Sequence, residues 1–455
     1  MMTRTVILLQ EMNDTGPRLS LYEPQTHPKA RTGVAFNLDS AVLFDNWSQG
    51  ALGPNSVESV GRQLYDSLLA QPAIKQELGQ AMQAAQDSEH PIYFYLDPAE
   101  ADRLPWETLH DAREGFLALD RRWPIARLKN PLLTQIKEVY EFSPPLRVLA
   151  ILSAAGSSND TRISARAEWD RIYDALNGSG LDFRLRAQVC EEQLAEYIKG
   201  LGDQRVEVAF VVDKDDLMQA IASFAPHFLH FFCHGSADVL SCLRVGNRAD
   251  WEAERDGSII LEANELRQRS DPGQSVWLLT LNCCESAKHA SDARNLAGQL
   301  VIAGFPAVVG MRERIASDHA HTFCALFYRE ILRLIARIPA DGPPTRIEWA
   351  SALWQVRATL LEHCRPGELA TLAAAGSKEW TMPVIYTRGQ PFWIQRRGAA
   401  MMSLAERVGL LAQVDALKSQ RDIFAARKDV DATVKQKTLE AFEKEIRRLE
   451  DELRT

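Results

Sequence analysis

The sequence predicts an α/β protein built around a mostly parallel sheet that helices cover on both faces. From residue 146 onward, short apolar runs alternate with longer segments of helical spacing, and such alternation is typical of parallel sheets. Two of the apolar runs, residues 227–234 and 276–284, also end at reactive side chains, His234 and Cys284. Ligands of open parallel sheets bind just beyond the carboxyl ends of the strands, so we expect a functional site there.

Length and composition limit the possible classes of protein. A chain of 455 residues with 46% hydrophobic and 25% charged residues is typical of a soluble globular protein of two to three domains. A net charge of −9, without a block of Lys and Arg, argues against direct nucleic-acid binding. Seven cysteines without a recognisable signal peptide predict reduced thiols and a cytoplasmic location. No apolar run approaches twenty residues, so no membrane span is expected.

Residues 1–142 carry the pattern of a smaller α/β half without a nucleophile of its own. Apolar runs bounded by Gly and Pro predict strands, and apolar residues at three- and four-residue steps predict helices. The predicted strands are 5–9, 19–22, 33–38 and 91–96, and the predicted helices are 57–69 and 73–85. We expect this half to be a non-catalytic companion of the half that follows.

Pro144 and Pro145 mark a boundary, because proline cannot continue a helix and biases the preceding residue to extended backbone. The second half is expected over residues 146–397, with residues 244–259 as a charged hairpin or loop. Besides the two runs that end at His234 and Cys284, the predicted strands are 146–152, 183–189, 307–311 and 384–386. The predicted helices are 163–176, 216–224, 264–268, 293–303, 317–335 and 347–363.

Residues 401–455 form a helical appendage, because they contain no Pro, one Gly and equal numbers of acidic and basic residues. Two helices broken around residues 428–431 are expected to fold back as an antiparallel hairpin. Its seams are Leu410, Val414, Leu417 and Phe424 on the first helix, and Leu439, Phe442, Ile446, Leu449 and Leu453 on the second. The hairpin either packs on the preceding half or pairs with another helix. The narrow seams favour self-association or docking onto a sensor or activator.

A Cys and a His at neighbouring strand ends indicate nucleophilic catalysis. A neutral thiol attacks carbonyls poorly, whereas a nearby imidazole can take its proton and later protonate the leaving amine. The backbone N–H groups of Gly235 and Cys284 are the expected oxyanion donors. Alternation along the strand places Cys233 on the face opposite to His234, where packing is expected. Spacing alone does not decide whether Cys283 or Cys284 is the nucleophile.

The motifs His-Phe-Phe-Cys-His-Gly at 230–235 and Leu-Asn-Cys-Cys-Glu-Ser at 281–286 resemble those of CHAT domains, caspase-like HetF-associated proteases related to separase. A His about fifty residues before the Cys is also the caspase-type separation. The resemblance extends over roughly residues 90–395, through matching stretches at 104–111, 115–120 and 303–310. It implies a caspase-like fold, a pseudo-caspase-like companion half, Cys284 as nucleophile and His234 as general base and acid.

The resemblance also singles out two residues on the substrate side. Asn282 replaces the family's usual Ser at a position that lines the primary pocket in caspase relatives. Asp318 stands where the family often has an acidic residue. It is expected either to recognise a basic substrate side chain or to act with Ser317 at a helix N-terminus. Because no arginine occurs in the two signature strands, an acid-directed pocket is not supported, and a neutral or basic residue is expected before the scissile bond.

The sequence thus predicts a cytoplasmic cysteine endopeptidase that cleaves a specific protein target, and the resemblance suggests a prokaryotic defence or cell-death pathway. The alternative is a catalytically silent CHAT-like scaffold that binds a partner through its C-terminal helices. No cofactor and no metal are expected, because the adjacent Cys283 and Cys284, even with His289, cannot comfortably share one tetrahedral ion. His319 and His321 are expected to be ordinary, partly exposed helix residues.

Overall fold

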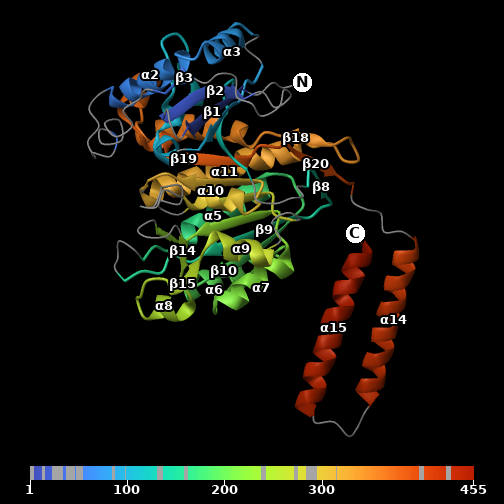
Figure 1. Cartoon of the computed structure of the whole chain (residues 1–455). Helices are drawn as coiled ribbons and strands as arrows, with labels where there is room; N and C mark the ends of the chain where they lie inside the picture. The colour runs from blue at the N-terminus through green and yellow to red at the C-terminus, as the bar shows by residue number, and fades with distance from the viewer. Residues whose placement is uncertain are drawn as a thin grey trace.

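The computed structural model describes most of the chain, namely residues 5–12, 16–22, 34–36, 47, 55–84, 88–97, 99–130, 137–157, 162–236, 242–270, 275–282, 295–313, 315–398, 404–426 and 432–454. Within these residues, twelve strands form one sheet that runs through the body of the molecule (Figure 1). In sheet order they are β11 (Val206–Phe210), β10 (Phe183–Val189), β9 (Leu146–Leu152), β12 (Phe228–Phe232), β16 (Leu278–Leu281), β17 (Ala307–Met311), β19 (Pro383–Arg388), β7 (Ile125–Lys129), β4 (Ile92–Leu96), β1 (Thr5–Met12), β2 (Gly16–Tyr22) and β3 (Val34–Ala35).

The pairing within this sheet is mostly parallel. Only three neighbouring pairs of these described strands run antiparallel, namely β17 with β19, β1 with β2 and β2 with β3. The predicted fold class, a mostly parallel α/β sheet flanked by helices, is therefore confirmed. The strand β19 comes late in the sequence yet lies between β17 and β7, so strands from both halves of the sequence share one sheet.

Helices bury both faces of the sheet. Adjacent residues of β9 belong to different cores: Val148 and Ala150 pack with Trp169 of a helix on one face, whereas Leu149 and Ile151 lie in a core on the other. Because successive side chains of a strand point to opposite faces, such a strand must be apolar throughout. Helices on the first face are α5 (Arg166–Gly178), α6 (Glu192–Gly200) and α11 (Ser317–Ala336), and those on the second are α7 (Lys214–Phe224), α9 (Ala263–Ser270) and α10 (Leu296–Ile302).

The first half of the sequence has its own core around α2 (Ser56–Leu69) and α3 (Pro72–Gln83), to which Trp380 and Leu361 also belong. Further helices of the body are α4 (Ala99–Arg103), α8 (Arg248–Glu252), α12 (Leu353–Cys364) and α13 (Ala370–Gly376). Three small sheets complete it: β5 (His110–Asp111) with β6 (Gly115–Phe116); β13 (His234–Ser236), β14 (Cys242–Val245) and β15 (Ile259–Leu261); and β18 (Thr345–Ile347), β20 (Phe392–Arg396) and β8 (Val139–Phe142).

Several elements differ from those predicted by the sequence. The helix α6 and the edge strand β11 were not predicted; β11 alternates half-buried and exposed positions, which leaves it little apolar signal. The region 244–259 contains α8 rather than only a hairpin or loop, because Asn247 and Asp250 cap that helix reciprocally. The region 347–363 begins as β18 and a 3₁₀ turn, and α12 starts only at Leu353.

A buried ion-pair network ties β7 to its surroundings. Arg127, which is 1% exposed, donates to the carboxylates of Asp102 at 3.0 Å and Glu107 at 2.9 Å, and both carboxylates are equally buried. Burial opposes the charge of Arg127, but Glu107, Tyr386 and Asp102 together outweigh this effect and raise the pKa of the guanidinium. The hydroxyl of Tyr386 on β19 donates to Asp102 at 3.1 Å, so the network spans the junction of the two halves.

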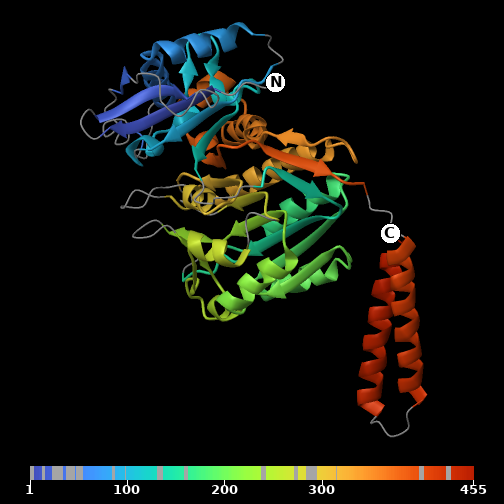
Figure 2. The same cartoon turned by 45° about the vertical axis from the view of Figure 1, so that its right-hand side comes forward.

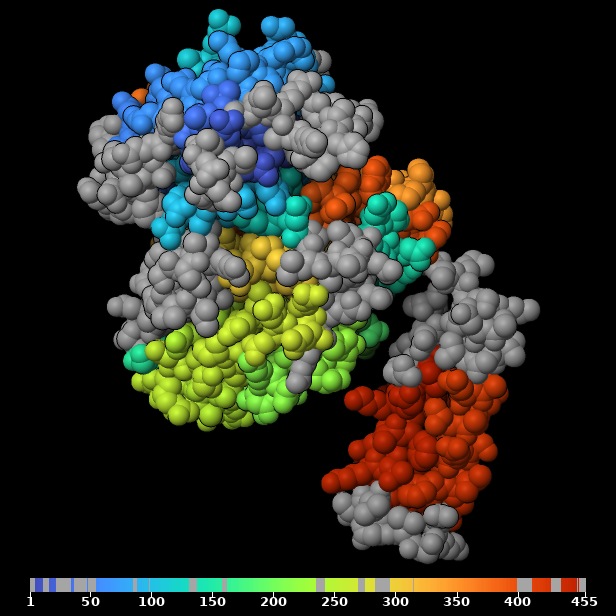
Figure 3. Space-filling model, in the orientation of Figure 1, coloured from blue at the N-terminus to red at the C-terminus, as the bar shows by residue number. Residues whose placement is uncertain are grey.

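The C-terminal helices α14 (Leu404–Ala426) and α15 (Ala432–Arg454) form the predicted antiparallel hairpin, which extends away from the body (Figures 2 and 3). The rings of Phe424 and Phe442 lie 6.4 Å apart between the two helices. Val414, Ile446 and Leu449 are buried between the helices. Among the described residues, none of the helices combines the length and apolarity that crossing a bilayer requires.

Candidate active site

The strands that lead to His234 and Cys284 are neighbours. β12 and β16 pair in parallel, with His230 opposite Thr280 and Phe231 opposite Leu281. Their carboxyl ends therefore meet at one edge of the sheet, as the argument from the sequence requires. Cys283, Cys284 and His289 lie outside the described residues, so the structure gives no geometry for the predicted nucleophile.

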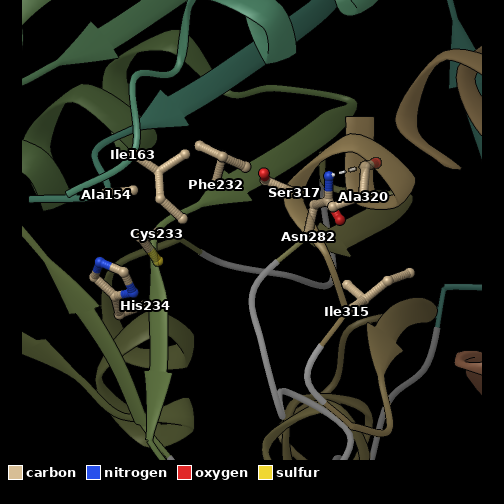
Figure 4. A pocket seen from close by; sticks show the side chains of 9 residues that line it. All are labelled: Ala154, Ile163, Phe232, Cys233, His234, Asn282, Ile315, Ser317 and Ala320. Carbon is tan, nitrogen blue, oxygen red and sulfur yellow. Dashed lines mark hydrogen bonds between the residues drawn. The ribbon is translucent and has the colours of Figure 1, made fainter. Parts of the chain in front are cut away.

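A pocket opens at this edge and brings together residues from four segments of the chain (Figure 4). Its described lining is mostly apolar, and none of the lining residues is acidic. They are Ala154, Ile163, Phe232, Cys233, His234, Asn282, Ile315, Ser317 and Ala320. The structure thus places His234 and Asn282 at one pocket, together with Ser317 from the first turn of α11.

His234 does not continue β12, which ends at Phe232. It begins β13, where it pairs with Arg244 of β14, and its side chain is half-buried. Gly235 follows in the same short strand, opposite Leu243. Cys233 belongs to the core on the other face of the sheet, together with Leu229 and Phe231, although it also reaches the pocket wall.

Asn282 is 3% exposed, and its amide is held in one orientation. Nδ2 donates to Oε1 of Glu168 at 2.6 Å and to the carbonyl oxygen of Ala320 at 3.0 Å. Because an ionised carboxylate only accepts hydrogen bonds, the nitrogen must face Glu168. Among the described residues, the buried Oδ1 has no hydrogen-bond partner, and Figure 4 shows it on the side of the amide away from Ala320. It is therefore a hydrogen-bond acceptor that the described part of the pocket leaves unused.

Glu168 on α5 is a fully buried carboxylate behind this pocket. Its Oε1 lies 2.9 Å from Nε2 of His230 on β12, and its Oε2 lies 2.7 Å from Nδ1 of His321 on α11. Burial alone would raise the pKa of Glu168, but hydrogen bonds from His230 and His321 and the electrostatic interaction with both imidazoles lower it to about 2. The carboxylate is thus ionised and joins three elements around Asn282.

Glu168 was not predicted from the sequence, and neither was the pairing of His321 with it. Glu168 lies one turn before Ile172 on the buried face of α5, and this four-residue step is the signal that could have found it. His321 was expected to be an ordinary helix residue, but it is 13% exposed and pairs with Glu168. Such pairings join residues far apart in the chain and leave no local pattern.

Asp318 lies in the first turn of α11 and its side chain is 70% exposed. It follows Ser317 but is not among the residues that line the pocket. Its carboxylate instead approaches His319 and His363, and ligand atoms of these three residues lie within 4.8 Å of one another. Among the described residues, Glu168, His230 and Cys324 form a second group of this kind, in the buried interior.

Comparisons with known proteins agree with the motifs. Residues 58–388 match the family model of the CHAT domain. Among solved structures, a chain of the Saccharomyces cerevisiae separase–securin complex is similar at 11% identity and a TM-score of 0.37, covering 72% of this chain but only 17% of that one.

Two further structures are similar over a comparable share of this chain. The Arg-specific cysteine proteinase gingipain R matches at 10% identity and a TM-score of 0.40, covering 74% of this chain and 68% of that one. The complex of Porphyromonas gingivalis RgpB pro- and mature domains matches at 9% identity and a TM-score of 0.39, covering 74% and 70%. A comparison with curated proteins finds no match. Because the family model matches well over half of this chain, the chain belongs to the CHAT domain family.

Proposed function

We propose that the chain is a caspase-like cysteine endopeptidase in which Cys284 is the nucleophile and His234 is the general base and acid. The observation that carries the proposal is the parallel pairing of β12 with β16, because it brings the segments leading to both residues to one edge of the sheet. The family supports the same reaction type. The two motifs that contain these residues are the ones that resemble motifs of the family.

The proposed reaction uses groups of this chain alone. The imidazole of His234 takes the thiol proton, and the thiolate of Cys284 attacks the peptide carbonyl. The N–H groups of Gly235 and Cys284 stabilise the oxyanion, and the imidazolium then protonates the leaving amine. In the second half of the reaction, His234 removes a proton from water, which hydrolyses the thioester and restores the thiol.

The pocket beside His234 is proposed to bind the substrate residue before the scissile bond. Its free acceptor, Oδ1 of Asn282, favours a side chain that ends in a hydrogen-bond donor, either neutral or basic. An aspartate there would set a carboxylate against this oxygen, with the ionised Glu168 behind it. Asp318 is a further proposed contact for a basic substrate residue, with a role at the N-terminus of α11 as the alternative.

The test of the dyad uses alanine variants of two neighbouring pairs of residues. We expect Cys284→Ala and His234→Ala each to remove nearly all cleavage of a peptide library derived from a bacterial proteome, read as new termini by mass spectrometry. Cys283→Ala and Cys233→Ala should retain most of it. Loss with Cys283→Ala and full activity with Cys284→Ala would move the nucleophile by one residue. A strict preference for Asp before the cut would contradict the proposed role of Asn282.

The second candidate function is a catalytically silent scaffold that binds a partner through α14 and α15. The hairpin favours it, because its helices extend from the body and leave Leu411 and Ile423 exposed. We propose that the hairpin mediates self-association or docking of a sensor, in a prokaryotic defence or cell-death pathway that the family resemblance suggests. Deleting residues 401–455 should reduce the number of chains in the assembly, measured as its mass in solution, or abolish activation of the peptidase by the sensor. The scaffold would be favoured if Cys284 does not react with alkylating agents and the protein cleaves no peptide.

A further inference from the structure

Four side chains with metal-binding atoms lie together where the first turn of α11 meets the last turn of α12. Asp318 and His319 belong to α11, and His363 and Cys364 are the last two residues of α12. Ligand atoms of Asp318, His319 and His363 all lie within 4.8 Å of one another. The Sγ of Cys364 lies 3.5 Å from Nε2 of His319.

Two of the ligand–ligand distances can be compared with those of a tetrahedral zinc site. With Zn–S of about 2.3 Å and Zn–N of about 2.05 Å, the tetrahedral angle places a sulfur and a nitrogen ligand about 3.6 Å apart. The 3.5 Å between Cys364 and His319 fits this edge. Oδ2 of Asp318 lies 3.9 Å from Nε2 of His319, against about 3.4 Å in such a site. The rings of His319 and His363 cross at 84° with centroids 5.7 Å apart.

We propose that Asp318, His319, His363 and Cys364 form a binding site for a divalent transition metal of the Zn²⁺ class. Two imidazoles, a thiolate and a carboxylate are the donors that Zn²⁺ prefers, whereas Mg²⁺ and Ca²⁺ prefer oxygen alone. The four residues come from two helices, and His319 and Cys364 are 45 positions apart. The site lies at the protein surface, since Asp318 is 70% exposed, so a metal can enter from solvent.

Helix electrostatics explains these residues only one at a time. A carboxylate near the N-terminus of α11 and a basic residue near the C-terminus of α12 are each favourable. That effect gives no reason for ligand atoms of Asp318, His319 and His363 to lie within 4.8 Å of one another, or for the Sγ of Cys364 to lie 3.5 Å from Nε2 of His319. The buried group of Glu168, His230 and Cys324 is a weaker candidate, because its carboxylate already accepts from Asn282 and lies beside His321.

A bound metal would cross-link the start of α11 to the end of α12. Ser317, which lines the pocket beside His234, immediately precedes Asp318. The metal therefore fixes one wall of the pocket. Because only the folded state brings the four ligands together, metal binding also raises the melting temperature of the chain. None of the four proposed ligands takes part in the proposed proton transfer or thiolate attack, but a metal bound to Asp318 would compete with the substrate contact proposed for that residue.

The test measures metal binding directly in the full chain with Cys283→Ala and Cys284→Ala, which removes the two adjacent thiols. We expect one equivalent of Zn²⁺ in competition with a chromophoric chelator, and a thiolate-to-cobalt charge-transfer band when Co²⁺ is used as the probe. In this background, Cys364→Ser should remove the band. Cys364→Ser and His363→Ala should each weaken Zn²⁺ binding by at least about 100-fold, since even losing an outer-shell partner costs 10- to 100-fold.

Two controls distinguish this site from others. Glu362→Gln changes an exposed carboxylate next to His363 and should leave the affinity unchanged. Cys324→Ser removes the thiol of the buried group and should leave the charge-transfer band in place. Circular dichroism of each metal-free variant checks that it is folded. The proposal is overturned if the parent binds no Zn²⁺, or if the band survives Cys364→Ser and disappears with Cys324→Ser.

Discussion

Replacing Glu168 with Gln tests the buried carboxylate that organises the pocket. The substitution keeps the shape of the side chain and removes its charge. A Gln at this position can still accept from Asn282, but its contacts with His230 and His321 lose their charge-assisted character. We expect the variant to fold with lower stability.

The expected loss follows from the pKa. The Glu168 carboxyl has a pKa lowered from 4.5 to about 2, which at 1.36 kcal/mol per pH unit corresponds to about 3 kcal/mol of stabilisation from the ionised form. A neutral hydrogen bond that the amide retains contributes about 1 kcal/mol. The free energy of unfolding should therefore fall by about 2 to 3 kcal/mol at pH 7.

The pH dependence has a definite sign. Because the pKa is lowered in the folded state, the stabilisation is fully present above pH 4.5 and is lost as the pH falls toward 2. The difference between the parent and Glu168→Gln should thus narrow by about 2 kcal/mol between pH 7 and pH 3. The Gln side chain does not titrate, so the variant lacks this contribution to the pH dependence.

The assay is urea denaturation followed by tryptophan fluorescence at several pH values. Glu207→Gln is the matched control, because Glu207 pairs with Arg186 at 2.6 Å but is 47% exposed, and such pairs contribute less than about 1 kcal/mol. The reasoning is refuted if both variants lose the same stability at pH 7. A difference between the parent and Glu168→Gln that stays constant down to pH 3 would also refute it.

Two further predictions concern the framework. Arg127→Met removes the cation that two buried carboxylates share and leaves Asp102 with Lys129 and Glu107 with Arg312. It should lower the free energy of unfolding by about 3 to 5 kcal/mol, whereas Arg186→Met should cost less than about 1 kcal/mol. Equal losses in urea denaturation would contradict the buried network. Gly61→Ala places a Cβ against the carbonyl oxygen of Thr108 and should destabilise the protein by about 1 to 3 kcal/mol. In Gly79→Ala the added Cβ meets nothing within 4 Å, so this variant should stabilise the protein by up to about 1 kcal/mol. Melting temperatures that shift in the same direction for both variants would contradict this packing.

Much of the framework could be predicted from the sequence, because local patterns report local burial. The apolar runs 146–152 and 307–311 coincide with β9 and β17, and the predicted helix 317–335 differs from α11 by one residue. Where burial is partial the pattern failed, as it did for β11, whose alternating positions are half-buried and exposed. The roles of His234 and Cys284 remain predictions, since Cys284 lies outside the described residues.

The sequence by itself determined the class of the fold and many of its strands and helices, and it predicted the chemistry at the ends of two strands. Tertiary structure decided which distant residues meet. It placed β19 between β17 and β7, and it brought Glu168 to Asn282 across 114 positions. Periodicity tells which face of a helix or strand is buried, but the neighbour across that face depends on how whole elements pack. The convergence of His319 and Cys364 at two helix ends, like the orientation of the Asn282 amide, exists only in the folded chain for that reason.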